Sequence, residues 1–285
     1  MTEITKATIT AQAGRLEQMI KKASLKASSG DAVHSEVYVN AGGGEARFLA
    51  SKQNNSVISY STFGAGFLDT VETDQEALVE DNNGTAEAII NVEDFLTYLN
   101  YATGDPSDTV ELTLLGEEND RLAHALQFHG AIQTRVMLPA SESNLDEVPL
   151  DAVGRFDDDT HSFLTGDGER MPALIETSVS QIQKIIDIVN DDDDTKFYPV
   201  TIQDGELYLS VGKDERRNAA WGALQADTVE GDDLSNEYNQ GFEELFGTLS
   251  GDLRIETADG MPICVVQDEY EGQVLRNVIG PVNKQ

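Results

Sequence analysis

The sequence predicts an α+β fold with two similar domains per chain, each combining antiparallel sheets with two helices. In four places, apolar residues recur at the i, i+3, i+4, i+7 spacing of a helix with one buried face, and strand-like runs separated by turn residues follow each helix. The second half of the chain repeats the order of the first. A length of 285 residues suits roughly two domains.

The first half opens with a strand and an amphipathic helix, followed by strand-rich sequence. A second helix starts at Val92 and ends at the turn residues 103–106. In order, we expect a strand at 7–10, a helix within 12–26, strands at 36–40, 47–50, 56–63 and 86–91, the second helix, and strands at 109–115, 122–129 and 131–138.

Residues 139–172 have a different character. They hold nine acidic and two basic residues, with Pro, Ser and Gly scattered through them and no sustained period. We interpret them as an exposed connector, longer than an ordinary loop. The expected organisation is therefore a domain at 1–138, an acidic connector with an insertion at 139–172, and a second domain at 173–285.

After the connector the pattern restarts. We expect a strand at 173–177, a third helix, strands at 197–203 and 206–211, a polar stretch to about Asp233, a fourth helix at 242–249, and strands at 253–257, 262–267 and 274–279.

The apolar faces of the helices repeat at nearly constant offsets. Adding 166 to Leu16, Met19, Ile20 and Ala23 gives Ile182, Ile185, Ile186 and Val189. Adding 150 to Val92, Phe95, Leu96 and Leu99 gives Phe242, Leu245, Phe246 and Leu249. A single match of this kind is common, but four in the same order indicate a duplicated unit.

The charge balance is extreme. The chain has 19 Lys and Arg against 52 Asp and Glu, a net charge of −33 spread over both halves. An acidic disordered chain is the alternative, but it would need no periodic apolar segments. A folded protein this acidic is typical of a very salty cytoplasm, where salt screens the self-repulsion.

Other classes find little support in the sequence. One cysteine, Cys264, offers no disulfide framework within the chain. The first residues lack an apolar signal core, and no run approaches the roughly 18 apolar residues of a membrane span. We therefore expect a cytoplasmic protein without membrane contact.

Four segments, in this order, resemble the sliding clamps of the proliferating cell nuclear antigen family, DNA polymerase processivity factors of archaea and eukaryotes. The segments are FLTYLNYATGDPSDTVELTL, SESNLDEVPLDA, GMPICVVQ and the terminal LRNVIGPV. With the acidic composition, the resemblance suggests a halophilic archaeal or archaeal-virus type. It implies a closed ring of three identical chains around double-stranded DNA, with helices lining the hole.

The resemblance also assigns residues to these tasks. The strands that pair between chains would lie at 131–138 and 206–211. Arg15, Lys22 and Lys26, on one stripe of the first helix, and Lys184 on the third would face DNA. Helices 92–102 and 238–249 carry no Lys or Arg, so retention would depend on the closed ring more than on phosphate contacts.

The resemblance further implies partners: DNA polymerase, the clamp loader, and other replication and repair proteins that bind through short peptides. Their groove would be formed by Leu145 and Val148 of the connector, with Pro262, Val278 and Pro281 from the C-terminal sheet. Asn277 stands where the family usually has an aromatic residue, and about 20 residues after Pro149 have no counterpart in the family.

Two alternatives remain open. An enzyme is one, but His34, His124, His129 and His161 show no metal-ligand spacing, and no glycine-rich phosphate loop follows a strand. We therefore expect no catalytic residues, no metal and no cofactor. The other is an acidic DNA mimic or scaffold that binds DNA-processing enzymes without encircling DNA.

The charge balance gives a first prediction. Lowering the salt from molar to millimolar concentration should loosen the fold, because the repulsion among the acidic groups is then unscreened. Circular dichroism along a salt titration measures this effect. A spectrum that keeps full secondary structure in dilute buffer would contradict it.

Overall fold

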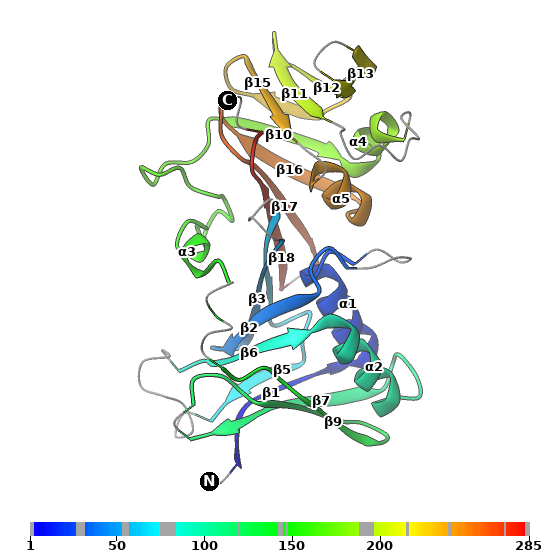
Figure 1. Ribbon diagram of the computed structural model, residues 1–285, viewed down its shortest axis with the longest axis vertical. Helices are drawn as coiled ribbons and strands as arrows, with labels where there is room; N and C mark the ends of the chain where they lie inside the picture. Colours follow the sequence, from blue (N-terminus) through cyan, green and yellow to red (C-terminus); the bar gives the residue numbers. More distant parts are fainter. Residues whose placement is uncertain are drawn as a thin grey trace. The chain divides into compact units, whose positions relative to one another are not determined.

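The computed structural model describes most of the chain: residues 3–26, 32–52, 57–74, 84–118, 120–141, 145, 148–187, 197–214, 217–238, 241–270 and 272–282, with the backbone alone at 211–214, 217–221 and 269–270. The chain divides into two units (Figure 1). The first contains Met1–Ser51, Ser59–Leu150 and Tyr270–Leu275. The second contains Lys52–Ile58, Asp151–Glu269 and Arg276–Gln285.

The elements of the first half follow the predicted order. They are β1 (Glu3–Gln12), α1 (Ala13–Ala23), β2 (Glu36–Gly42), β3 (Glu45–Ser51), β4 (Val57–Phe63), β5 (Thr70–Thr73), β6 (Ala86–Asn91), α2 (Val92–Ala102), β7 (Thr109–Glu117), β8 (Ala125–His129) and β9 (Gln133–Met137).

The second half repeats this succession after the short helix α3 (Leu150–Val153). It contains β10 (Ala173–Ser178), α4 (Val179–Ile186), β11 (Tyr198–Gln203), β12 (Glu206–Asp214), β13 (Arg217–Leu224), β14 (Thr228–Glu230), β15 (Leu234–Tyr238), α5 (Gly241–Thr248), β16 (Asp252–Thr257), β17 (Ile263–Tyr270) and β18 (Gln273–Ile279).

Strand order repeats as well. The first half forms the order β5-β1-β7-β8-β9 and the order β4-β3-β2-β6. The second half forms β14-β10-β16-β17-β18 and β13-β12-β11-β15. Where two of these strands pair with a defined register, they run antiparallel, as β1 and β7 do, or β11 and β12. The α+β fold class with two similar halves is therefore confirmed.

The core of the first unit is formed by the apolar faces of α1 and α2 together with both sheets. The first face, Leu16, Met19, Ile20 and Ala23, is fully buried, and so are Val92, Phe95 and Leu99 of the second. Asn91 caps α2: its side-chain oxygen accepts the backbone N–H of Asp94 at 3.1 Å, which satisfies one of the free donors at the helix start.

The third and fourth helical faces are buried in the second unit, where α4 and α5 lie side by side (Figure 1). Ile182, Phe242, Leu245 and Phe246 are buried. Ile185 is only half-buried. A Cβ added to Gly222 of β13 would come within 3.1 Å of its Cδ1, so this side chain packs against a strand that the sequence did not predict. Val189, the last residue of the predicted third face, lies outside the described residues.

Three expectations were wrong. The stretch from 212 to Asp233, expected to be polar, contains β13 and β14, and strands β5 and β15 were also missed. Strand β12 therefore lies between β11 and β13, so 206–211 is not a sheet edge. The connector is not uniformly exposed either, because Phe156, Phe163 and Met171 are buried.

The first helix ends with the last residue of its predicted apolar face, before the predicted stripe of basic residues reaches Lys26. It stops at Ala23, and Leu25 adopts a left-handed conformation with φ of 51°. A residue of this kind cannot continue a right-handed helix. Lys26 therefore follows the helix and does not extend the stripe formed by Arg15 and Lys22.

A core substitution tests this packing. Phe95 is fully buried, with its ring centroid 5.2 Å from that of Phe128. Replacing Phe95 with Ala should cost about 3–5 kcal/mol of unfolding free energy, through lost burial and the cavity left behind. Urea unfolding in molar salt measures it. Tyr101→Ala, on the same helix but 62% exposed, is the matched control and should change stability by less than about 0.5 kcal/mol.

Candidate DNA-facing helices and docking residues

The start of α1 is held by the loop that follows α2. The N–H groups of Ala13 and Gly14 donate to the carbonyl oxygens of Asp108 and Pro106, both at 2.8 Å, so two of the free donors of the helix are satisfied by backbone. The loop approaches closely because residue 14 is glycine. A Cβ there would lie 3.2 Å from the Pro106 oxygen.

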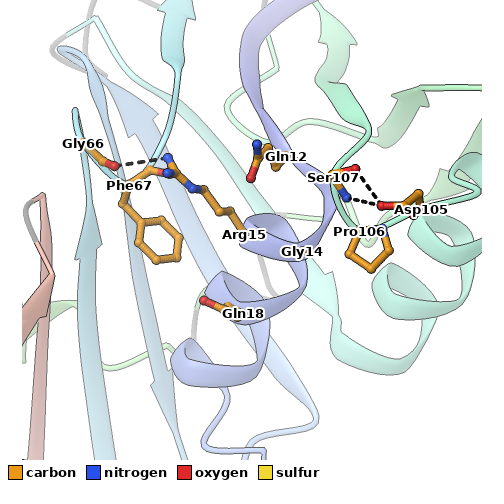
Figure 2. Close-up of a pocket in the computed structure, with 9 residues that line it drawn as sticks. All are labelled: Gln12, Gly14, Arg15, Gln18, Gly66, Phe67, Asp105, Pro106 and Ser107. Carbon is orange, nitrogen blue, oxygen red and sulfur yellow. Dashed lines mark hydrogen bonds between the residues drawn. The ribbon is translucent and has the colours of Figure 1, made fainter.

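Arg15 extends from this helix start across to the loop after β4. Its Nη1 donates to the carbonyl oxygens of Phe67 at 2.9 Å and Gly66 at 3.1 Å (Figure 2). The guanidinium group thus fixes the loop between β4 and β5. Arg15 was predicted to face DNA. In this structure its donors are at least partly occupied by the protein's own backbone.

These groups line a cavity of about 680 Å³ in the first unit (Figure 2). Its lining is Gln12, Gly14, Arg15, Gln18, Gly66, Phe67, Asp105, Pro106 and Ser107. Both the hydroxyl and the N–H of Ser107 donate to Asp105 Oδ1, and these hydrogen bonds hold the pKa of Asp105 below its ordinary value. The site therefore offers amides, one guanidinium group and one carboxylate.

The other predicted cations of the first unit also have partners in the chain. Lys26 forms an ion pair with Glu93 at the start of α2, with 2.7 Å between Nζ and Oε1. Lys22 Nζ lies 3.4 Å from the side-chain oxygen of Gln273. Lys21, which was not predicted to contact DNA, is paired with Glu17 one turn earlier.

In the second unit Lys184 lies on α4, exposed, and donates to Gln181 Oε1 at 3.2 Å. The other helix of each unit begins with acidic residues, Glu93 and Asp94 in α2 and Glu243 and Glu244 in α5, with no basic residue in the last turn. The folded helices α2 and α5 therefore carry little positive charge, as expected from the sequence.

The residues assigned to the docking groove differ in exposure. Leu145 and Val278 are buried, whereas Val148, Pro262 and Pro281 are half-buried. Pro262 directly precedes β17, and Val278 lies within β18. Their role in docking stays a prediction.

Within the described part of the chain, no cluster of three or more His, Cys, Asp or Glu side chains could hold a metal ion. Among those residues, too, no helix is long and apolar enough to span a membrane.

The most informative feature that could not be predicted from the sequence is the sheet edge formed by β13. In the first unit β9 is the last strand of its sheet, as expected from 131–138, and in the second unit β13 is the last described strand beside β12. Strand β13 was not predicted because its sequence, which begins with Arg217 and Asn218, shows only weak alternation of apolar and polar residues.

Solved structures share this architecture over the whole chain. The PCNA of A. fulgidus, solved with the C-terminal region of FEN-1, has a TM-score of 0.68 and 11% identity, covering 98% of this chain and 99% of that one. The PCNA of Entamoeba histolytica gives 0.68 and 11%, covering 98% and 100%. The DNA polymerase sliding clamp of Pseudomonas aeruginosa gives 0.67 and 12%, covering 99% of this chain and 68% of that one.

Sequence comparisons add nothing further, because no family model and no curated protein matches the chain. At such low identity, the likeness establishes the fold. The chain has the fold of the DNA sliding clamps.

Arg15 provides a test that separates a structural role from a DNA-facing one. Arg15→Ala removes two charge-assisted hydrogen bonds to the carbonyls of Gly66 and Phe67 and should cost about 1–2 kcal/mol. Hydrogen exchange at residues 64–68 should accelerate. Lys184→Ala, which removes only an exposed contact, is the control and should leave stability within about 0.5 kcal/mol. Unchanged exchange in Arg15→Ala would contradict the structural role.

Proposed function

We propose that the protein is a DNA sliding clamp, a processivity factor that encircles duplex DNA and tethers replication and repair proteins. The observation that carries this proposal is a duplicated architecture that matches clamps over 96–99% of the chain. The chain acts by assembly and attachment, without chemistry of its own.

Ring closure is supported by the internal repeat. Strand β18 follows β4 in the order of the sheet, and in the first unit, which holds Ser59–Phe63 of β4 and Gln273–Leu275 of β18, the N–H of Gly64 donates to the Gly272 oxygen at 2.7 Å. By their positions in the repeat, β13 corresponds to β4 and β9 to β18. The free edges of β9 and β13 are therefore the natural partners for the same kind of pairing between copies.

Pairing of β9 with the β13 of another copy is a head-to-tail contact, which closes into a ring when the rotation permits. We propose three copies. The edge of β9 is available for pairing with another copy. The N–H of Leu138 donates to the His124 oxygen at 2.8 Å, so it points toward β8. Because successive N–H groups of a strand point to opposite sides, those of Gln133, Arg135 and Met137 point away from β8.

Retention on DNA would then be topological. A net charge of −33 opposes a long contact with phosphates, and Lys22, Lys26 and Arg15 already have contacts within the chain. At molar salt the Debye length is about 3 Å, so attraction and repulsion are both short-ranged. We propose that Arg15, Lys22, Lys26 and Lys184 face the duplex but add little affinity, and that the protein works in a salty cytoplasm of a halophilic archaeon or its virus.

Partners would dock through short peptides. The A. fulgidus PCNA was solved with the C-terminal region of FEN-1. Another solved structure similar to this chain is a PCNA2-PCNA3 complex from Sulfolobus tokodaii. The S. tokodaii chain covers 96% of this one at TM-score 0.63 and 13% identity. For this chain we propose polymerase, clamp loader and repair enzymes as partners, with Leu145, Val148, Pro262, Val278 and Pro281 as docking residues.

The test is primer extension on a primed circular template with the cognate polymerase and loader, in molar salt. The protein should lengthen the products strongly on the circle and less on a linear template, from which a ring slides off. Met137→Pro removes one outward N–H from β9 without removing a bond to β8, so it should abolish the stimulation.

Met137→Thr is the matched control, because it keeps the N–H and suits a strand, and it should stimulate like the wild type. Met137 is 65% exposed, so neither change disturbs the core. Equal stimulation by the Pro variant would contradict edge pairing. No stimulation by the wild type, with tight binding to the polymerase alone, would instead favour an acidic DNA mimic or scaffold.

A further inference from the structure

The insertion after Pro149 is folded as a small hairpin in the second unit. Residues 155–164 turn back on themselves: Phe156 pairs with Phe163 as an antiparallel bridge, and Leu164 N–H donates to the Arg155 oxygen at 2.7 Å. The two aromatic rings meet edge to face, with centroids 5.0 Å apart, and both side chains are buried.

The hairpin is anchored to the sheet through polar contacts. Arg254 Nη2 of β16 donates to the Thr160 oxygen at 2.6 Å, and Ser162 Oγ donates to Glu256 Oε1 at 2.8 Å. Glu256 is the direct cross-strand neighbour of Cys264 in β17, and the backbone N–H of Phe163 bonds to the Cys264 sulfur. The hairpin therefore covers the face of β16 and β17 that carries these side chains.

His161 connects the hairpin to β18. Arg276 Nη2 donates to His161 Nδ1 at 3.1 Å, and the Arg276 side chain is only 2% exposed. Because a guanidinium group has no acceptor, Nδ1 must be unprotonated for this bond to exist. The backbone of His161 is left-handed, with φ of 61°, a conformation that few residue types adopt readily.

The charges that face His161 come from every element around it. Arg276 of β18 and Arg254 of β16 oppose a positive ring, whereas Asp268 of β17 and Asp158 of the hairpin favour one. Burial is the largest effect, followed by Arg276, and together they lower the pKa of His161 below its ordinary value. A lowered pKa means that the closed state binds fewer protons than the open one, so closure weakens as the pH falls below about 6.5.

We propose that the hairpin 155–164 is an acid-opened cover over the β16–β18 face, with protonation of His161 as the trigger. A proton on Nδ1 removes the acceptor for Arg276 and places two positive groups in contact. Opening releases Phe163 and Ser162 from the sheet. It exposes Arg254, Glu256 and Arg276, together with the thiol of Cys264.

Cys264 reports opening directly, because it is the one cysteine in the sequence and is fully buried. The experiment measures its labelling rate with 4,4′-dithiodipyridine, which reacts with thiols in mild acid, between pH 7.5 and 5.5 in molar salt. The fraction of molecules with an open hairpin should increase as a histidine of ordinary pKa becomes protonated. This fraction should rise roughly tenfold between pH 7.5 and 5.5.

His161→Asn is the decisive variant. The Asn side-chain oxygen occupies the place of Nδ1, does not titrate, and tolerates the left-handed backbone. The rate ratio of wild type to this variant should rise about tenfold from pH 7.5 to 5.5, since intrinsic thiol reactivity cancels in the ratio. His129→Asn in the first unit is the matched control and should keep the wild-type response.

Phe163→Ala tests the cover itself: weakening the hairpin should raise labelling at every pH, with an unchanged circular dichroism spectrum. A wild-type to His161→Asn ratio that stays constant with pH would overturn the trigger. Labelling of Phe163→Ala at the wild-type rate would overturn the claim that the hairpin shields this face.

Discussion

The unpaired edge of the β-sheet is the constraint on which the rest of this structure depends. Strand β9 ends its sheet with the backbone donors of Gln133, Arg135 and Met137 directed outward, and β13 ends the described sheet in the second unit. Exposed edges of this kind invite pairing with any other strand. A ring whose copies pair edge to edge satisfies these donors and prevents open-ended association. The proposed function thus follows from a problem that every antiparallel sheet must solve.

Charge has a secondary part in this account. With 52 acidic and 19 basic residues, the chain cannot hold DNA through a broad basic surface. The folded structure lowers the available positive charge further, since Lys26 is paired with Glu93 and Arg15 binds backbone carbonyls. A closed ring needs no such surface, because linkage with the duplex does not depend on contact energy. Surface acidity is then free to maintain solubility in concentrated salt.

Much of the fold could be predicted from the sequence, because the four helical faces are local patterns: Leu16 and Phe95, for example, are buried as their spacing requires. The four-residue strand β5 and the strand β13, whose sequence is RNAAWGAL, were missed because neither shows a sustained alternation of apolar and polar residues. The end of α1 depends on the backbone of Leu25, and the partners of Arg15 lie about fifty residues away. Such long-range contacts leave no trace in local spacing. The buried hairpin around Phe156 escaped for the same reason.

The mass of the assembly in solution tests the central claim most directly. Light scattering during size-exclusion chromatography, in molar salt and at micromolar concentration, should give a single species of three times the chain mass of 31.0 kDa. A closed ring leaves neither β9 nor β13 available to a further copy, so the mass should not increase with concentration. A lasting monomer, or a mass that grows continuously with concentration, would contradict edge-to-edge closure.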